Sequence, residues 1–269
     1  MAVTLEEVRR TVSGDYRKIC LKLAALGLFI IVCSWHTGLL DLKRMVEGGP
    51  ALWQLLGEMF PPDFTNMAKW GKPVVDTLCM SVAGTFIALV LSLPVGLMAA
   101  GNVAPNRAVY RLARGVLNIL RSVPELIMGI IFVAAVGFGA LPGALALGLH
   151  SVGMVGKFFA ESIEHCDPKP VEAIRAVGAT RAQTVLYGIL PQVMPQLVDT
   201  LVYRWEYNFR ASTVMGMVGA GGIGFELMAS LRIMQYQEVS AILLVILVMV
   251  TLVDGLGSRI RRKVSWIQS

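Results

Sequence analysis

Long apolar runs separated by short polar segments fill the chain. Six of these runs are long enough to cross a membrane, at about residues 19–37, 74–100, 112–137, 144–163, 192–218 and 239–258. A transmembrane helix needs roughly 20 mostly apolar residues. Within lipid, a single segment satisfies its own backbone hydrogen bonds only as a helix. The pattern therefore predicts an all-α, polytopic membrane protein with six transmembrane helices.

The first run follows basic residues, as the apolar part of a secretory signal peptide does. Residues 23–40 are free of formal charge over 18 positions, and no small-residue cleavage site follows them. We therefore expect an uncleaved first helix. The next segment, 38–73, is too polar to span, and its aromatic residues, including Trp53 and Trp70, are typical of a membrane interface.

The charges between the runs predict an orientation. Sixteen of the 24 Lys and Arg residues fall on the side of the N-terminus, five on the opposite side and three within the runs. Because positive charge gathers in cytoplasmic loops, both termini and the polar segment 167–191 are predicted to face the cytoplasm, in a bacterial inner membrane. The chain then consists of a cytoplasmic segment 1–18, a membrane domain 19–258 and a cytoplasmic tail 259–269.

Composition agrees with a membrane protein. The chain is 55% hydrophobic and 16% charged, with a mean hydropathy of +0.66, whereas soluble domains carry about 25% charged residues. The net charge of +6 is not gathered into one soluble patch, so we expect no nucleic-acid partner. Neither the four cysteines nor the three histidines show metal-ligand spacing, so neither a metal nor a cofactor is expected in this chain.

An amphipathic segment, 171–191, interrupts the apolar pattern between the fourth and fifth runs. Two short helices are expected in it, over 170–177 and 179–187, with Gly178 between them for a tight turn or a close backbone approach. Small side chains on it permit a partner surface to come near. An ordinary cytoplasmic loop is the alternative.

In the same segment, a Glu-Ala pair is followed by a glycine and then by Leu-Pro, at Glu172, Ala173, Gly178, Leu190 and Pro191. This pattern resembles the cytoplasmic signature loop of the permease subunits of binding-protein-dependent ABC importers. Ile174 and Gly188 depart from the usual pattern, which has Ala and Ile there. The resemblance implies a type I importer permease fold and a coupling helix, within the loop 167–191, that seats in a groove of an ATPase subunit. The residues expected to couple to the ATPase are Glu172, Ala173, Ala176, Gly178, Ala179, Thr180, Leu190 and Pro191.

Further stretches narrow the resemblance to the phosphonate permease subgroup, which is close to the methionine permeases. They are residues 203–224, the sequence Phe60-Pro61-Pro62-Asp63-Phe64, and residues 190–195. This resemblance implies a homodimeric pore, two cytoplasmic ATPase subunits that hold ATP and Mg, and an external binding protein that delivers phosphonate or phosphite. No ATP-binding motif lies in this chain.

Charged residues inside the runs are candidates for the translocation path. Such residues are costly in a membrane and usually face a polar pathway or each other. Glu206 with Arg210, and Arg121 with Glu125, are spaced to share a helix face, whereas Arg204 points elsewhere. Structural ion pairs are the alternative. An oxyanion path is favoured by the forked donors of arginine, with Arg210 as first candidate and Arg204 as second.

A glycine-rich stretch follows the fifth run and matches a dinucleotide-binding motif by letter. No strand precedes it and no βαβ unit surrounds it, so a nucleotide site is rejected. The glycines instead predict an irregular or re-entrant backbone near the mouth of the pore, with a gate or hinge role as a hypothesis. They are Gly219, Gly221, Gly222 and Gly224.

Two other functions stay open on the sequence. One is a permease for methionine or another small solute, against which the arginines of the fifth run argue. The other is a membrane-embedded enzyme acting on phosphoesters, against which the lack of a clustered nucleophile or metal-ligand set argues.

Overall fold

The computed structural model of the protein describes residues 5–265 and divides into two compact units, one up to Glu58 and one from Met59 onwards. Residues 1–4 and 266–269, parts of the predicted cytoplasmic segment and tail, lie outside the described residues. The first unit holds helices α1 (Leu5–His36) and α2 (Leu42–Glu58). The expected boundaries at residues 18 and 258 concern the membrane and stay predictions.

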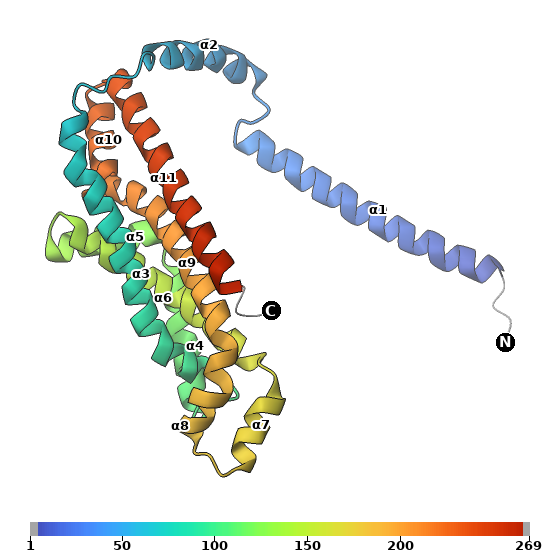
Figure 1. Ribbon diagram of the computed structural model, residues 1–269. Coiled ribbons are helices and arrows are strands. Elements are labelled where there is room, and N and C mark those ends of the chain that lie inside the picture. Colours follow the sequence, from blue (N-terminus) through green and yellow to red (C-terminus); the bar gives the residue numbers. More distant parts are fainter. Residues whose placement is uncertain (1–4, 266–269) are drawn as a thin grey trace. The chain divides into compact units, whose positions relative to one another are not determined.

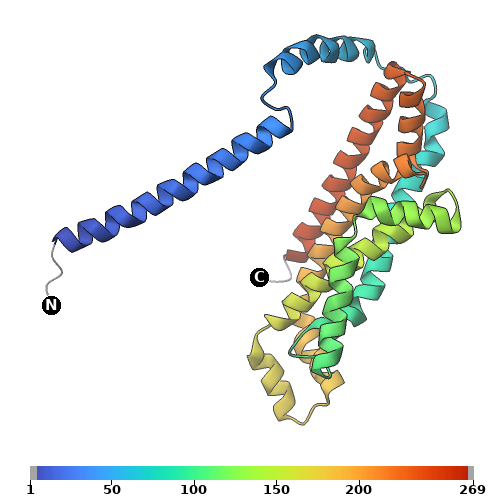
Figure 2. The same cartoon turned by 180° about the vertical axis from the view of Figure 1, so that it is seen from behind.

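The second unit is a bundle of long helices (Figure 1). Figure 2 shows the same bundle from behind, with α4 and α5 in green towards the viewer. No strand occurs between residues 5 and 265, as the all-α prediction requires. Its elements are η1 (Met67–Trp70), α3 (Gly71–Ala99), α4 (Arg107–Ser122), α5 (Glu125–Val136), α6 (Ala140–Glu164), α7 (Pro168–Ala176), α8 (Arg181–Gln183), the π-helical segment η2 (Thr184–Ile189), α9 (Leu190–Met215), η3 (Gly216–Val218), α10 (Ile223–Arg232) and α11 (Tyr236–Ser265).

Five helical segments of the described chain are long and apolar enough to cross a membrane, and a broken pair supplies a sixth. The pair is α4 and α5, which meet at an angle of 89°. A continuous helix over 112–137 was expected, and that expectation is wrong. Pro124 disfavours helical backbone at the preceding residue, and Val123 is extended, with ψ 119°.

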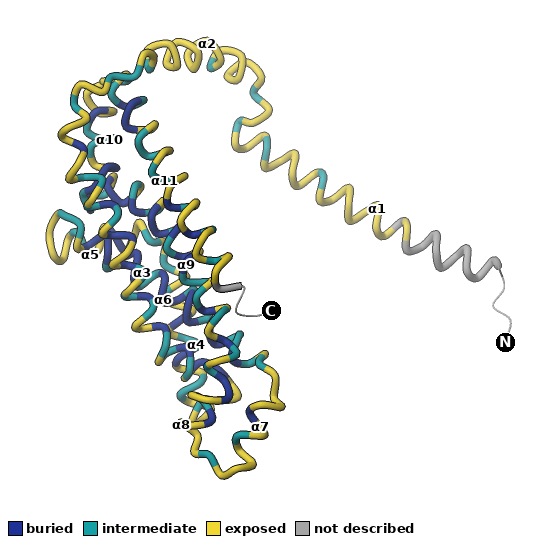
Figure 3. The backbone as a smooth tube through the Cα atoms, in the orientation of Figure 1, coloured by how far each residue is buried: buried dark blue, intermediate teal, exposed yellow. Residues whose placement is uncertain are grey.

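Helix α6 lies at the centre of the bundle. Its membrane window is 72% buried, against 28% for the windows that contain α3 and α9. Glycines allow this close packing: a Cβ at Gly96 of α3 would lie 2.6 Å from Phe159 Cδ1, and one at Gly153 of α6 would lie 2.7 Å from Arg121 N. Small residues let membrane helices approach closely where apolar burial gives no net drive. Figure 3 shows the buried residues concentrated along these central helices.

Helix α10 was not predicted as a separate element. It begins after the glycine-rich stretch, where the Thr77 hydroxyl of α3 accepts the Ile223 N–H at 2.9 Å and so caps its first turn. The glycine-rich stretch is not an exposed loop, because Gly219, Ala220 and Gly222 are buried. Irregular backbone is tolerated at membrane depth when protein surrounds it in this way.

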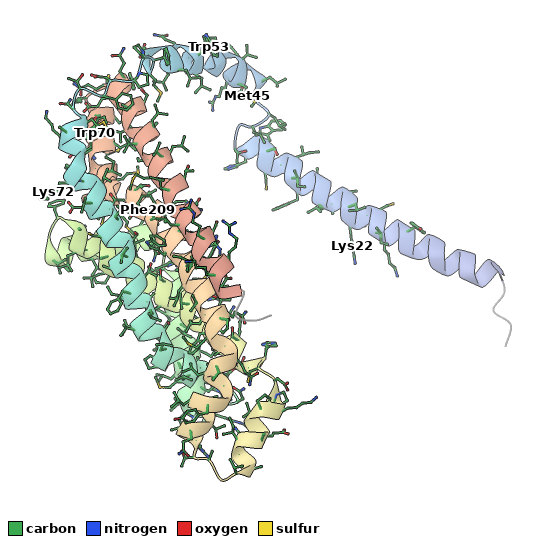
Figure 4. All side chains as sticks on the ribbon, in the orientation of Figure 1. Lys22, Met45, Trp53, Trp70, Lys72 and Phe209 are labelled. Atoms are coloured by element: carbon green, nitrogen blue, oxygen red, sulfur yellow. The ribbon has the colours of Figure 1, made fainter. Side chains whose placement is uncertain are left out.

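In the first unit, Lys18–His36 has the length and apolarity of a span, as predicted for the first run. Helix α2 has no buried residue and is amphipathic, with Met45, Val46 and Trp53 exposed on it beside the charged Lys43 and Glu47. Figure 4 shows the Met45 and Trp53 side chains projecting from this helix. This is the pattern of a helix in a membrane interface, so the interfacial assignment stays as predicted.

Candidate functional site

The loop between α6 and α9 projects from the end of the bundle opposite α10 (Figure 1). Asp167 caps α7, where its carboxylate accepts the Lys169 N–H at 3.0 Å, and Pro168 occupies the first turn. The helix ends at Ala176, and Gly178 adopts φ +85° with no atom within 4 Å of a Cβ built on it. Of the two roles predicted for Gly178, the structure therefore shows the tight turn.

The second half of the loop differs from expectation. Thr180 and Gln183 form a capping box, and the helix then runs from Arg181 through the π-helical turn η2 into α9. A separate short helix over 179–187 is wrong, because nothing interrupts this run. Pro191 is the second residue of α9 and follows the π-helical turn directly, so its missing N–H leaves one carbonyl of that turn without a helical donor.

Gln192 joins the two ends of the loop at its base, a role that no pattern in the sequence indicated. Its Oε1 accepts the Asp167 N–H at 2.9 Å, and its Nε2 donates to the Gly188 carbonyl at 2.6 Å and to the Asp167 carbonyl at 3.3 Å. One side chain thus joins the start of α7 to the start of α9. The loop is held at both ends as one rigid unit.

The two departures from the family pattern lie against each other. A Cβ at Gly188 would lie 3.3 Å from Ile174 Cδ1 and 3.4 Å from Val171 Cα. The larger side chain on α7 therefore fills the space that the glycine on η2 leaves. Val171 and Ile189 belong to the largest apolar core cluster, so the inner side of the loop is part of the bundle core.

The outer side of the loop is available to a partner. Glu172, Ala173, Ala176 and Thr180 are exposed, and Val177 is 85% exposed. Beside them lies a groove of about 390 Å³ lined by Ala179, the two arginines Arg175 and Arg181, and the 102–105 loop. Leu190 is half-buried and Pro191 exposed. An exposed apolar side chain on a rigid polar loop is what a docking surface requires; the coupling role of these residues stays a prediction.

The charged residues of α9 do not pair with each other. Glu206 and Arg210 share a face, as predicted, but both reach across to α11. Glu206 accepts from Arg261 at 2.7 Å, and Arg210 donates to Asp254 at 2.9 Å. The first pair is buried on the Glu206 side, where the side chain is 6% exposed, and the second is half exposed. The spacing predicted the shared face, but the ion pairs run between α9 and α11 and not within α9.

Arg204 points away from α11, as expected. It is buried, donates from Nε to Ser151 Oγ of α6 at 2.8 Å, and lies over the Tyr207 ring at 4.1 Å. Ser151 in turn donates to Asn208, and Asn208 donates to Thr85 of α3. A polar network thus connects α3, α6 and α9 inside the bundle.

The predicted pair of Arg121 with Glu125 is also wrong, because the break between α4 and α5 separates them. Glu125 accepts the Tyr207 hydroxyl at 2.7 Å and lies 3.7 Å from His150 Nε2. Arg121 is exposed at the end of α4. The break therefore brings Glu125 to Arg204 and Tyr207, a grouping that sequence spacing could not indicate.

A polar stripe runs along the exposed face of α9. At spacings of three and four residues, Gln196, Asp199, Tyr203 and Arg210 are all exposed, with Tyr207 half-buried between them. Polar side chains on a membrane helix face a bundle interior or a water-filled path and not lipid. This stripe is the candidate translocation path of the chain.

The glycine-rich stretch lies close to several backbones. Gly219, Gly221 and Gly222 have positive φ, and the Gly139 N–H donates to the Gly219 carbonyl at 3.2 Å. A Cβ at Gly224 would lie 1.6 Å from the Thr213 carbonyl oxygen. These positions exclude side chains; their role as a gate or hinge stays a prediction.

Comparison with known proteins places this bundle in a family. The family model described as "Binding-protein-dependent transport system inner membrane component" matches residues 92–266. The chain belongs to this family. The expected resemblance is thereby confirmed, and the chain is a transporter's inner-membrane component and not an enzyme.

Individual relatives agree with this assignment. The phosphite transport system permease protein PtxC of Stutzerimonas stutzeri is 63% identical over 249 residues, which cover 93% of this chain and 90% of PtxC. The putative phosphite transport system permease protein HtxC of the same organism is 38% identical, covering 96% of this chain and 91% of HtxC.

A solved structure supports the fold. A chain of the MetNI methionine ABC transporter in an inward facing conformation matches with a TM-score of 0.65 and 26% identity, over 74% of this chain and 97% of that chain. The fold of this permease is the type I ABC importer fold, as predicted.

Proposed function

We propose that this permease imports phosphite or phosphonate across the bacterial inner membrane. The observation that carries the proposal is the 63% identity to PtxC over nearly the whole of both chains. The exposed stripe of α9 supports it, since it presents Arg210 to any solute that passes along this face. Arginine suits tetrahedral oxyanions because its planar fork donates two hydrogen bonds at once.

The proposal includes the partners that the family implies. Two cytoplasmic ATPase subunits, holding ATP and Mg, receive the loops between α6 and α9, and an external binding protein delivers the ligand. Two copies of this chain form the pore, with a second, different permease chain as the alternative. Both termini face the cytoplasm, since sixteen of the 24 basic residues share that side.

Closure of the ATPases moves the α7 loops, and the bundle carries that movement to the pore. The capping of α7 and the clamp by Gln192 support this, because a loop fixed at its base transmits force without bending. The helix from Arg181 into α9 then connects the ATPase face directly to the polar stripe.

A methionine importer is the second candidate, and the structural match to MetNI supports it. That match is 26% identical, whereas the match to PtxC is 63% identical. Family membership sets aside the membrane-embedded phosphoester enzyme. The assembled transporter, reconstituted in liposomes with its binding protein, should take up phosphite or a phosphonate but not methionine.

The charge of Arg210 is expected to be needed for uptake. Arg210→Gln leaves Asp254 as an unpaired negative charge beside the path, so an oxyanion is repelled and uptake by reconstituted transporter should be abolished. The variant should still insert and bind its ATPase, because the pair is half exposed. Arg210→Gln with Asp254→Asn should recover part of the uptake; normal uptake by Arg210→Gln alone contradicts a role for this charge.

A further inference from the structure

Arg204 carries a buried hydrogen-bond donor that the described chain does not satisfy. The residue is 4% exposed, and its Nη2 has no hydrogen-bond partner among residues 5–265. Leaving a buried donor of a charged group unpaired is unfavourable, because it has lost water and gained nothing in return. Arg204 lies inside the bundle of a transporter. We therefore expect the acceptor for its free donor to be a ligand from outside the chain.

The guanidinium is held rigidly from behind. Ser151 accepts from Nε at 2.8 Å and donates to Asn208 Oδ1 at 2.9 Å, and Asn208 donates to Thr85 at 3.0 Å. Ser151 and Asn208 are fully buried. Arg204 is thus fixed against α6 and α3, which pre-organises its remaining donors for a ligand.

Tyr207 covers the opposite side of Arg204. Its ring centroid lies 4.1 Å from the guanidinium carbon, and its hydroxyl donates to Glu125 Oε1 at 2.7 Å. Tyr207 is half-buried and follows Tyr203 by one turn on the polar stripe of α9. The ring therefore separates Arg204 from the candidate path, and the hydrogen bond to Glu125 holds the ring in place.

Glu125 belongs to a different element from Tyr207. It is the first residue of α5, directly after the break at which α4 and α5 meet at 89°. A change in the angle between α5 and α9 therefore breaks the bond to Tyr207.

We propose that Arg204 is an oxyanion-binding site inside the permease, which Tyr207 closes and its hydrogen bond to Glu125 latches. The inference rests on the proposed function. It adds a second site at which the transporter selects its substrate, after the external binding protein. A tetrahedral oxyanion accepts from the free Nη2 and supplies a counter-charge to Arg204. The ligands of this site are phosphite, phosphonate and similar anions, which present two oxygens to one guanidinium.

Arginine-directed labelling of the whole transporter tests this site. The complex of permease, ATPase and binding protein is treated with phenylglyoxal, and labelling of Arg204 and of Arg210 is read from peptide masses. Arg204 should be protected at rest and become labelled when ATP and vanadate trap the complex. Inorganic phosphite should suppress that labelling, and chloride at equal ionic strength should not. Arg210, 51% exposed on its side chain, should be labelled both at rest and after trapping, so it controls for access of the reagent and not for competition by phosphite.

Tyr207→Phe tests the latch without removing the ring. The variant loses only the hydroxyl that donates to Glu125, so labelling of Arg204 at rest should rise about fivefold, the effect of one hydrogen bond on a two-state equilibrium. Tyr203→Phe, one turn away on the same face, should leave it unchanged. Equal labelling of Arg204 at rest and in the trapped complex overturns the proposal, as does an unchanged resting value in Tyr207→Phe.

Failure of the proposed function gives a different result. It shows as an absence of phosphite uptake by the unmutated complex with its binding protein. The oxyanion site is tested without measuring transport, by whether an anion reduces the labelling of Arg204. It is rejected when none of phosphite, inorganic phosphate and sulfate reduces the labelling.

Discussion

Gly224→Ala should abolish the folded permease. A Cβ at this position would lie 1.6 Å from the Thr213 carbonyl oxygen and 2.8 Å from the carbonyl carbon. It would overlap backbone atoms, which can move away only if the two helices separate. The reverse contact is also too close for a side chain, because a Cβ at Gly216 would lie 2.3 Å from Phe225 N. Separating α9 from α10 should cost about 4 kcal/mol or more, at the extreme of single substitutions.

The measurement is the yield of monodisperse protein after detergent extraction, together with its thermal unfolding. Gly255→Ala is the matched control, since Gly255 lies in helix α11 with nothing within 4 Å of a built Cβ. That variant should be stable and gain about 0.5–1 kcal/mol from the better helix former. A Gly224→Ala protein that unfolds at the temperature of the parent contradicts the close approach of α9 and α10.

Glu206→Leu should be the most destabilising change among the ion pairs. It leaves Arg261, which is 29% exposed on its side chain, without the carboxylate it donates to at 2.7 Å. Breaking a buried pair in this way costs about 3 kcal/mol, the lower end of the usual range, because Arg261 keeps some contact with solvent. The result is a lower unfolding temperature of the solubilised protein.

Asp254→Leu is the matched control for that change. It removes the acidic partner of Arg210 from the same helix pair, but both side chains are at least 41% exposed, so the loss should stay within about 1 kcal/mol. Glu206→Leu combined with Arg261→Met should recover most of the stability, since an apolar pair can replace a buried ion pair. Equal losses from Glu206→Leu and Asp254→Leu would show that burial of Glu206 has no energetic role.

The sequence was sufficient for features that depend on local pattern. The apolar runs predicted the helical spans, and Gly178 predicted the turn of the loop, because both follow from residue type within a few positions. The family assignment rested on Glu172, Gly178 and Pro191 in the right order. Pro124 could have indicated the break between α4 and α5, since the residue before a proline disfavours helix.

The contacts between distant segments could not be predicted. Spacing along α9 placed Glu206 and Arg210 on one face, but their partners Arg261 and Asp254 lie on α11, 55 and 44 residues further along the chain, respectively. The grouping of Arg204, Tyr207 and Glu125 depends on the angle at Pro124, which no local pattern specifies. Helix α10 was missed because its cap, Thr77, lies 146 residues earlier.

Crosslinking at the loop between α6 and α9 tests the central claim most directly. Thr180 and Ala176 are exposed on this loop, so a cysteine at either position can meet a cysteine on a bound ATPase. In the assembled complex, Ala176→Cys and Thr180→Cys should each form a crosslink to the ATPase subunit, and the yield should change when ATP and vanadate are added. Crosslinks from neither position, or solute uptake by this chain without any ATPase, would contradict the account.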